Sequence, residues 1–379
     1  MLREFPYYIH LHHIFSFRFA LGEVLKKLDG NKIQNLLSKL EETFITLAIP
    51  KMKVETNYGL REALIKMGIT ELFSSNADLS GISKSPPLHI SDALHNAIIE
   101  VDEEGTTAAA ATMFLPVGSA LILEEPKEFI ADHPFMFILT KGKNPLFMGH
   151  MFLQAETDFG MKMLRQTSIN ETCVVSPVSV ILALAAIQIG AKGQTKSQIS
   201  RAISNGATDI EVTKYYSHLS EEIVHHKKGT ATTIANGFFM DEKFAVRKSY
   251  GSALIKRFTT KVKSFRFKET RAISERIDSY VSRKTYGRIK HIHAPSNIKD
   301  ALSLLVSAAS FASKWEYSFV KSLNTRGVFY SRKSFERKVE YMNVVKENRY
   351  YAENEHMQVL SLRYSDTSYA LNIFLPKQK

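Results

Sequence analysis

The side chains with the most obvious chemical potential are three histidines near the start of the sequence and a single cysteine. His10, His12 and His13 lie close together, but no carboxylate or thiol partner accompanies them, so their pattern is a weak one for a metal. Cys173 lies in the apolar run TCVVSPVSV, where a small buried hydrophobic residue is expected rather than a nucleophile. One cysteine permits no internal disulfide, so core packing must stabilise the fold, and a reducing compartment is compatible with this composition. We expect no metal site and no thiol catalysis.

A phosphate-binding loop is also unexpected. The run Gly190-Ala-Lys-Gly-Gln-Thr-Lys-Ser197 has its outline, but Thr195 stands where a second glycine must let backbone amides approach a phosphate. The patterns HExxH, GxSxG, GxGxxG and CxxC do not occur. These enzyme signatures are therefore missing, and we expect no cofactor and no catalytic residues.

The segment with the most unusual composition is 101–126, VDEEGTTAAAATMFLPVGSALILEEP. It opens with three acidic residues, Asp102, Glu103 and Glu104, which are followed by Gly105, a flexible pivot. The threonines and alanines that come next have side chains small enough to enter a packed sheet. The four alanines could instead begin a helix, or the segment could be a mobile surface loop. A loop of about 25 residues without element signals is unusual and often functional.

The surrounding elements are a mixture of helices and strands. Apolar residues at helical spacing predict helices at Phe19–Leu28, Gly30–Leu40, Tyr58–Met67, Glu156–Arg165 and Pro177–Ile189. β-Branched and aromatic runs predict strands at Thr43–Val54, Leu94–Val101, Phe135–Leu139, Thr232–Met240, Leu302–Phe311 and Met357–Leu375. No internal repeat is present. The irregular order favours an α+β fold with large, partly antiparallel sheets.

Length and hydropathy are those of an ordinary globular chain. The 379 residues suffice for one large domain or two to three smaller ones. No run approaches the roughly 18 apolar residues of a membrane-spanning helix; the most apolar stretch, Val174–Ile189, is interrupted by Ser176, Pro177 and Ser179. The N-terminal stretch MLREFPYYIHLHHIFSF lacks the apolar core and the small-residue cleavage site of a signal peptide. We expect no membrane association, and the sequence favours a cytoplasmic location.

Charge is distributed unevenly along the chain. Residues 1–152 hold 14 Lys and Arg against 18 Asp and Glu, whereas residues 153–379 hold 36 against 20. Between Lys256 and Lys290, twelve basic residues meet three acidic ones. Such a stretch is usually a solvated face of strands and helices, but it is also compatible with weak binding of a polyanion. No groove-reading motif accompanies it, so we expect no specific nucleic-acid recognition.

Several motifs together resemble the serpin family. Glu103, Glu104, Gly105, Thr106 and the alanines Ala108, Ala109, Ala110 and Ala111 are similar to the hinge of its reactive-centre loop. Before this hinge, LHISDALHNAIIEVDEEG, NADLSGIS and PKMKVE resemble family segments, and DHPFMFIL and PLFMGH resemble the closing strands after it. Four runs of the second part also resemble family elements. The shutter helix is similar to CVVSPVSV, and a sheet strand is similar to TTIANGFFMDEKF. The helix overlying the main sheet is similar to IDSYVSRKTYGRI, and the strand that leads to the breach tryptophan, Trp315, is similar to LVSAASFASKWEYSF. The resemblance covers nearly the whole chain beyond Phe17.

The resemblance implies a fold and a mechanism. The fold has three β-sheets surrounded by about eight or nine helices and an exposed reactive-centre loop, here residues 101–126. A target protease cleaves the loop, and the freed hinge inserts as a strand into the main sheet before the acyl-enzyme hydrolyses. Gly105 turns the corner, Thr106 enters first, and Ala108 and Ala110 face the core in the period-two pattern of a strand.

Opening of the sheet requires a shutter, a buried polar network between two strands. The resemblance places His95, Ser176, Pro177 and Ser179 there. Two positions depart from the family pattern: Ser307 stands where asparagine is common in the shutter, and Asp278 where asparagine is common in the overlying helix.

The scissile bond is bracketed by two ways of counting. The family's usual spacing from Gly105 gives Ser119 and Ala120, whereas counting back from Pro134 leads to the neighbourhood of Leu123, with Leu121 between them. No Lys or Arg occurs between Gly105 and Pro126, so a trypsin-like target is not expected. The candidates favour a chymotrypsin-like or elastase-like serine protease, or a cysteine cathepsin.

The family segments occur in exchanged order. Residues 18–150 resemble the family's C-terminal half and residues 152–379 its N-terminal half, with 1–17 a non-family extension; together they make one serpin domain. A circular permutation would be tolerable where the cut falls in an exposed loop. The alternative is a gene model in which the end of one serpin gene has been merged with the start of its tandem neighbour. Met151 resembles the initiating methionine of such a second gene, which favours this alternative.

Three functional classes follow from the resemblance: an inhibitor, a non-inhibitory serpin that acts as a carrier or chaperone, and an inactive fusion product. Non-inhibitory relatives tend to lose the small-residue hinge, which this chain keeps, so the inhibitor is favoured. The family resemblance also implies a monomer, and the extracellular space is the common family location.

Overall fold

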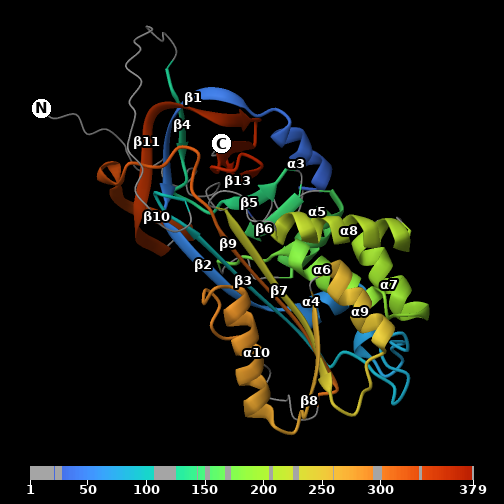
Figure 1. Cartoon of the computed structure of the whole chain (residues 1–379). Helices are drawn as coiled ribbons and strands as arrows, with labels where there is room; N and C mark the ends of the chain where they lie inside the picture. The colour runs from blue at the N-terminus through green and yellow to red at the C-terminus, as the bar shows by residue number, and fades with distance from the viewer. Residues whose placement is uncertain are drawn as a thin grey trace, which may run out of the picture. The chain divides into compact units, whose positions relative to one another are not determined.

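In a computed structural model of the chain, the structure describes residues 21, 28–105, 125–142, 144–149, 154–166, 172–204, 208–224, 230–258, 260–292, 301–332 and 335–377. The chain divides into two compact units, shown as a cartoon in Figure 1. The first comprises residues 1–53, 100–142 and 313–379, and the second residues 54–99 and 143–312. Each unit therefore takes segments from both halves of the sequence.

The first unit contains a large, mostly antiparallel sheet. Its strands run in the order β4-β1-β11-β12-β13-β5, and β10 pairs with β11. Only β1 and β4 pair in parallel among these neighbours. The bounds are β1 Glu41–Pro50, β4 Lys127–Ile130, β5 Met136–Lys141, β10 Thr325–Arg332, β11 Phe335–Glu353, β12 Met357–Arg363 and β13 Tyr369–Pro376, with the helix α3 at Gly30–Leu37 and a short helix η3 at Lys321–Leu323.

One long strand of this sheet pairs with three neighbours along its course. β11 has 19 residues, and its first part pairs with β10 while its later part pairs with β1 and then β12. A strand of this length can hydrogen-bond to different neighbours along its course. The described strands form two sheets, of eight and five strands, where the resemblance implies three.

Two predicted elements are each divided in the structure. The strand predicted at Thr43–Val54 is wrong as a single element, because β1 ends at Pro50 and β2 begins at Met52. Proline lacks the N–H group that a ladder requires, which explains the break. The strand predicted at Met357–Leu375 is likewise a hairpin, because Asp366 accepts hydrogen bonds from the backbone and hydroxyl of Ser368 and closes a turn between β12 and β13.

The second unit is built on a five-stranded sheet in the order β2-β3-β9-β7-β8. β3 and β9 pair in parallel, residues 92–98 against 304–310, and β9 pairs with β7 in the antiparallel direction. β8 pairs in parallel with β7 and forms an edge of the sheet. The bounds are β2 Met52–Gly59, β3 Asp92–Val101, β7 Ala231–Asp241, β8 Lys261–Phe265 and β9 Ser303–Ala312.

Helices cover both faces of this sheet (Figure 1). On one face lies α6, whose residues are all buried and uncharged, as expected of a helix that is apolar all round. On the other lies α10, which packs Ile273, Ile277 and Tyr280 onto Phe239 of β7 and its neighbours. The helices of this unit are α4 Leu60–Lys66, α5 Gln154–Leu164, α6 Pro177–Gln188, α7 Gly193–Ser204, α8 Asp209–Val224, α9 Lys248–Phe258 and α10 Thr270–Lys284, with η1 at Glu71–Phe73 and the strand β6 at Asn144–Gly149.

Four of the predicted helices are present, and two of them are shorter than predicted. The helix predicted at Gly30–Leu40 ends at Leu37, and the one at Tyr58–Met67 begins only at Leu60, because β2 continues to Gly59. The helix predicted at Phe19–Leu28 lies mostly outside the described residues. None of the helices that the structure describes is long and apolar enough to span a bilayer.

Candidate functional site

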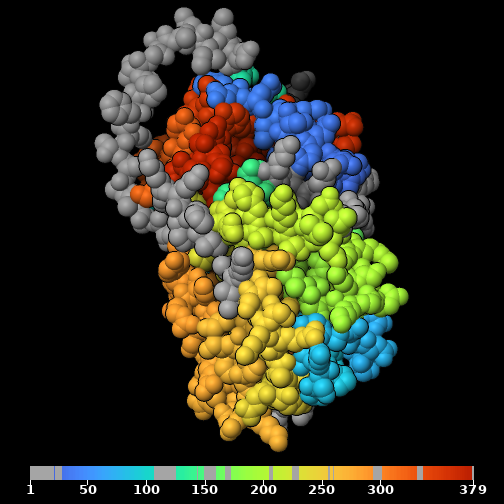
Figure 2. All heavy atoms as spheres, turned by 45° about the vertical axis from the view of Figure 1, so that its right-hand side comes forward, coloured from blue at the N-terminus to red at the C-terminus, as the bar shows by residue number. Residues whose placement is uncertain are grey.

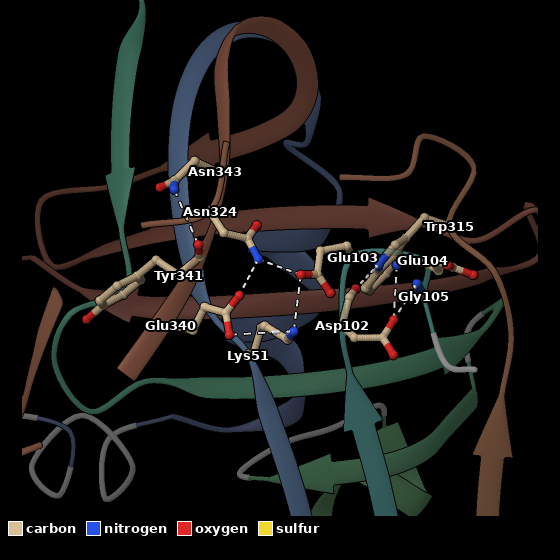
Figure 3. Close-up of polar contacts among 10 residues, drawn as sticks. All are labelled: Lys51, Asp102, Glu103, Glu104, Gly105, Trp315, Asn324, Glu340, Tyr341 and Asn343. Atoms are coloured by element: carbon tan, nitrogen blue, oxygen red, sulfur yellow. Dashed lines mark hydrogen bonds and ion pairs between the residues drawn. The ribbon is translucent and has the colours of Figure 1, made fainter. Parts of the chain in front are cut away.

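The chain turns sharply directly after β3, at Asp102–Gly105, which we call the hinge turn (Figure 3). The backbone N–H of Asp102 donates to the carbonyl of Gly105 over 3.2 Å, and the reverse bond measures 3.3 Å. The Asp102 carboxylate also accepts from the backbone N–H groups of Glu104 and Gly105, over 3.0 and 3.1 Å. An aspartate that bonds amides two and three residues ahead fixes a turn locally. Asp102, the first of the three consecutive acidic residues, therefore sets the shape of the hinge turn.

Only glycine fits the last position of the hinge turn. Gly105 has φ +121°, in a region that other residues rarely adopt. A Cβ atom there would lie 2.3 Å from the carbonyl oxygen of Ser313 and 2.6 Å from Cα of Lys314. Both are backbone atoms, which cannot move aside as the end of a flexible side chain can. The close approach allows Gly105 to form an isolated antiparallel bridge with Lys314.

Trp315 holds the hinge turn from the other side. Its indole N–H donates to the carbonyl of Asp102 over 2.8 Å, and its backbone N–H donates to the carbonyl of Glu104 over 3.0 Å. The ring stacks on Tyr364 at a centroid distance of 4.4 Å and meets Phe319 edge to face. Trp315 is only 4% exposed. A buried aromatic ring with a satisfied polar end is a rigid anchor, so it fixes the position of the hinge turn.

A polar group of four side chains anchors the same turn, and we call it the breach cluster: Lys51, Glu103, Asn324 and Glu340. The buried carboxylate of Glu103 accepts from Nζ of Lys51 over 3.1 Å and from the Asn324 amide. Glu340 lies 3.7 Å from the same Lys51 nitrogen and accepts from Asn324 over 2.7 Å. Figure 3 shows these side chains converging from separate segments of the chain. The cluster ties the hinge turn to the residue that follows β1, Lys51, and to β11 through Glu340.

The electrostatics of this cluster favour a charged Glu103. Burial alone would raise its pKa, but hydrogen bonds from its own backbone amide, Asn324 and Lys51 outweigh burial and hold the pKa below its ordinary value. Burial likewise opposes the charge of Lys51, yet the hydrogen bond and attraction of Glu103 keep its pKa raised. Each group therefore stabilises the ionised form of the other.

A second buried polar group lies in the second unit, and we call it the shutter cluster: His95, Ser176, Ser179, Asn236 and Ser307. The hydroxyls of Ser179 and Ser307 lie 2.9 Å apart, and Ser307 also contacts Nδ1 of His95 through its carbonyl, at 3.2 Å, and its hydroxyl, at 3.3 Å. The Asn236 amide donates to the carbonyl of Ser179 over 2.8 Å. These side chains link the parallel strands β3 and β9 to each other and to the start of α6.

The protonation of His95 follows from its partners. The backbone N–H of Ser176 donates to Nε2 over 2.8 Å, so Nε2 carries no proton and Nδ1 donates towards Ser307. Complete burial lowers the pKa of His95 to about 4, and the Ser307 carbonyl offsets this only in part. The ring is therefore neutral near pH 7. A charged ring would also turn a second donor toward the Ser176 amide.

The two positions that depart from the family pattern both make contacts. Ser307 belongs to the shutter cluster, as described above. Asp278 on α10 accepts from the backbone N–H of Ile292 over 2.8 Å and lies 3.1 Å from Nδ1 of His291. A serine and an aspartate therefore serve as hydrogen-bonding groups where the pattern led us to expect asparagine.

The structure describes part of the expected site. Glu103, Glu104 and Gly105 lie together beside Trp315, and His95, Ser176 and Ser179 lie together, with Pro177 as the first residue of α6. The remaining hinge residues and every scissile-bond candidate lie outside the described residues: Thr106, Ala108, Ala109, Ala110, Ala111, Ser119, Ala120, Leu121 and Leu123. So do His10, His12 and His13. Within the described part of the chain, no group of His, Cys, Asp or Glu residues is arranged to hold a metal.

Sequence reasoning missed the partners of Glu103. Lys51, Asn324 and Glu340 lie in ordinary strand or loop sequence, and only Lys51 carries a local signal, in the motif PKMKVE. The sequence separation from Glu103 is 52 residues for Lys51 and 221 for Asn324, so no local pattern connects them.

Comparison with known proteins gives the family. Residues 16–153 and 154–379 match the family model described as "Serpin (serine protease inhibitor)". Iripin-4 of Ixodes ricinus is 42% identical over 133 residues, which are 34% of this chain and 33% of that protein. The leukocyte elastase inhibitor of Bos taurus is 43% identical over 109 residues, 28% of each chain. The matched stretch thus spans about a third or less of these curated relatives.

Solved structures show the same fold. The native stressed conformation of Arabidopsis AtSerpin1 gives a TM-score of 0.52 at 20% identity and covers 56% of each chain. The reactive-loop-cleaved human thyroxine-binding globulin gives 0.54 at 22% identity and covers 59% of this chain and 68% of that one. The hinge turn, the two polar clusters and a family match along both segments lead to one conclusion. The chain belongs to the serpin family.

Proposed function

We propose that this chain inhibits a protease as a suicide substrate. The target's serine attacks a carbonyl carbon in the segment that follows the hinge turn, the peptide bond breaks, and the amine product leaves with a proton. The acyl-enzyme ester remains. Insertion of the freed hinge into the five-stranded sheet, between β3 and β9, then precedes hydrolysis of that ester and traps the protease.

The direct parallel pairing of β3 with β9 is the observation that carries this proposal. The hinge turn reverses the chain directly after β3, so a strand continuing from Gly105 would run antiparallel to β3. Because β9 is parallel to β3, the same strand would be antiparallel to β9 as well. Insertion would replace one parallel ladder with two antiparallel ladders, and antiparallel pairing is slightly more stable per residue. The sheet can therefore gain hydrogen bonds by accepting a strand at this place.

The shutter cluster supports the same proposal. It is buried and polar, and it bridges the two strands that must separate. Apolar packing at this point would lose its contacts outright on separation, whereas hydroxyl and imidazole groups can rotate to new partners on an inserted backbone.

The loop composition directs the choice of target. Basic residues are absent between Gly105 and Pro126, and the scissile candidates are small or aliphatic. The leukocyte elastase inhibitors of Bos taurus and Sus scrofa, 43% and 42% identical over the matched stretch, are elastase inhibitors by name. We infer a chymotrypsin-like or elastase-like protease as the target, with a cysteine cathepsin as the second candidate class.

A protease panel tests the proposal directly. The chain is incubated with chymotrypsin, elastase and trypsin, and the products are separated by denaturing electrophoresis. We expect a denaturant-resistant band of inhibitor plus protease with chymotrypsin or elastase, and none with trypsin or with an elastase whose serine has been blocked beforehand. Cleavage of the chain without any retained complex would exclude inhibition and identify a non-inhibitory serpin.

We also infer that the two family segments form one serpin domain in this exchanged order. In the first unit β1 pairs with β11, and in the second unit β3 pairs with β9. In each pair, one strand comes from residues 18–150 and the other from residues 152–379. Neither segment can complete its ladders without the other.

A further inference from the structure

A basic hollow lies between the edge strand β8 and the helix α10 of the second unit. It encloses about 270 Å³ and is lined by Phe239, Lys261, Lys263, Phe265, Arg276, Ser279, Tyr280 and Arg283. Loop insertion as proposed above uses none of these residues. In Figure 2 the two elements, gold and orange, lie side by side on the visible face of the molecule.

The spacing of the residues explains why they meet. On β8, Lys261 and Lys263 are two residues apart, so both point to the same face of the strand. On α10, Arg276 and Arg283 are seven residues apart, which places them on one face of the helix, two turns from each other. The strand face and the helix face meet at the hollow, so four cationic side chains surround one space.

Aromatic rings form the floor and hold the cations in place. Phe239 stacks on Phe265 at 5.8 Å and meets Tyr280 edge to face at 5.9 Å, and all three are buried. Lys261 lies over the Tyr280 ring at 5.5 Å, and Arg276 lies over the Phe265 ring at 5.4 Å. Cation–π contacts of this kind orient a charge without neutralising it. These contacts orient Lys261 and Arg276, and they cover the faces of Tyr280 and Phe265 that a ligand would otherwise stack on.

The charge of this hollow is uncompensated within the part of the chain that the structure describes. No carboxylate there forms an ion pair with Lys261, Lys263, Arg276 or Arg283. The nearby acids have other partners: Glu275 pairs with Arg271, and Glu242 with Arg266. Partial burial, followed by the charges of Lys263 and Arg283, lowers the pKa of Lys261, as expected where cations repel one another.

Protection of a sheet edge explains only part of this arrangement. Lysines on an edge strand discourage pairing with another chain, which accounts for Lys261 and Lys263 on β8. It does not account for two arginines from the helix that line the same hollow. Like charges gathered in one place are unfavourable by themselves, so a counter-charge is needed.

We infer that this hollow binds a compact oligophosphate, an anion that carries several phosphoryl groups within a few ångströms. Guanidinium groups bind phosphoryl oxygens in a bidentate manner, and lysines add point charges. The hydroxyl of Ser279 lies in the same lining as a further donor. A compact anion fits because the cations surround one space instead of following a line, as an extended polysaccharide would require.

The test is calorimetric titration of the full chain with tripolyphosphate at a fixed ionic strength of about 0.1 M. We expect saturable binding to one site, and weaker binding of orthophosphate, which cannot reach all four cations at once. The double variant Arg276→Gln/Arg283→Gln should bind tripolyphosphate at least tenfold more weakly. If that variant unfolds, Lys263→Gln, an exposed change on the edge strand, takes its place with a smaller loss of affinity.

Lys268→Gln is the matched control, because it removes one charge from the same basic stretch at an exposed residue outside the hollow. Its affinity should stay within about twofold of the parent chain. The inference is overturned if tripolyphosphate gives no saturable binding. It is also overturned if Lys268→Gln weakens binding as much as a change within the hollow, or if a long heparin chain binds while tripolyphosphate does not, because the attraction would then belong to the whole surface.

Discussion

The backbone N–H of Ser176 donates to Nε2 of His95 over 2.8 Å, and the ring is completely buried. This single contact couples the first turn of α6 to the middle of β3. The imidazole can serve as the acceptor only while it is neutral, so the link between helix and strand depends on pH.

The first prediction concerns this dependence. The pKa of His95 is lowered from 6.5 to about 4, so the unfolded chain binds a proton between these values and the folded chain does not. The neutral His95 ring therefore makes its full contribution to the free energy of unfolding above pH 6.5. The free energy of unfolding falls by about 3 kcal/mol in total as the pH falls from 6.5 towards 4. Denaturant unfolding at a series of pH values measures it.

His95→Gln supplies the comparison, since glutamine cannot titrate. We expect this variant to be less stable than the parent at pH 7 and to lose less stability between pH 6.5 and 4. Parallel curves for the two chains would show that His95 does not titrate as its burial implies.

The second prediction concerns the breach cluster. Glu103→Gln should lower the free energy of unfolding by about 1–2 kcal/mol at pH 7. It removes the negative charge to which Lys51 and Asn324 donate hydrogen bonds in a partly buried site. The pKa of Glu103 is lowered, so its contribution is present above the ordinary value of 4.5 and is lost as the pH falls through the folded value. The difference between parent and variant should therefore shrink in acid.

Glu340→Gln is the control for this change, because Glu340 contacts the same lysine from a more exposed position. It should lower the stability by no more than about 0.5 kcal/mol. Equal losses from the two substitutions would mean that burial of Glu103 gives the ion pair no added strength.

The third prediction separates close contact from backbone strain in the hinge turn. Gly105→Ala should destabilise the chain by roughly 2–4 kcal/mol, because the new Cβ atom adds a clash with the Ser313 carbonyl to the strain of a positive φ. Gly142→Ala also has a positive φ, but nothing lies within 4 Å of its Cβ position, so it should cost about 1 kcal/mol. Equal melting temperatures for both variants would argue against the tight approach at Gly105.

The fourth prediction tests insertion itself. Thr106→Arg should leave loop cleavage intact and convert the inhibitor into a substrate, because a guanidinium would have to lose its water without a partner at the first step of insertion. Thr106 lies outside the described residues, so this prediction rests on its position after Gly105. Cleavage should markedly raise the melting temperature of the parent chain and leave that of the variant nearly unchanged.

The control is Thr367→Arg, at an exposed residue in the turn between β12 and β13. An exposed change of this kind usually shifts stability by less than about 0.5 kcal/mol, so the cleaved control should gain as much thermal stability as the parent. If cleaved Thr106→Arg gains the same amount, the strand that inserts does not begin after Gly105.

The fifth prediction concerns the exchanged order. Residues 1–150 and residues 152–379, expressed separately, should each lack cooperative unfolding, because β1 without β11 and β3 without β9 leave long strands unpaired. Mixing the two pieces should restore a cooperative transition, measured by circular dichroism. Cooperative unfolding of either piece alone would show that the two segments are separate domains.

Local sequence determined much of the fold and some of the site. The acidic step before Gly105 marks the hinge turn because an aspartate bonds the amides that follow it and glycine alone tolerates the backbone angle. The run beginning at Pro177 gives a buried helix because it has no polar face. The strands β7 and β9 follow from their β-branched and apolar runs. Each of these depends on neighbours along the chain, so a sequence pattern can carry it.

Tertiary structure alone decided which side chains meet. Glu103 finds Asn324 across 221 residues, and the acceptor role of His95 depends on an amide of another segment. The hollow between β8 and α10 likewise exists only because a helix face settles against a strand edge. In each case burial removes water from a polar group, which then needs a hydrogen-bonding or charged partner from another part of the chain. That partner lies far away in the sequence, so no local pattern can predict it.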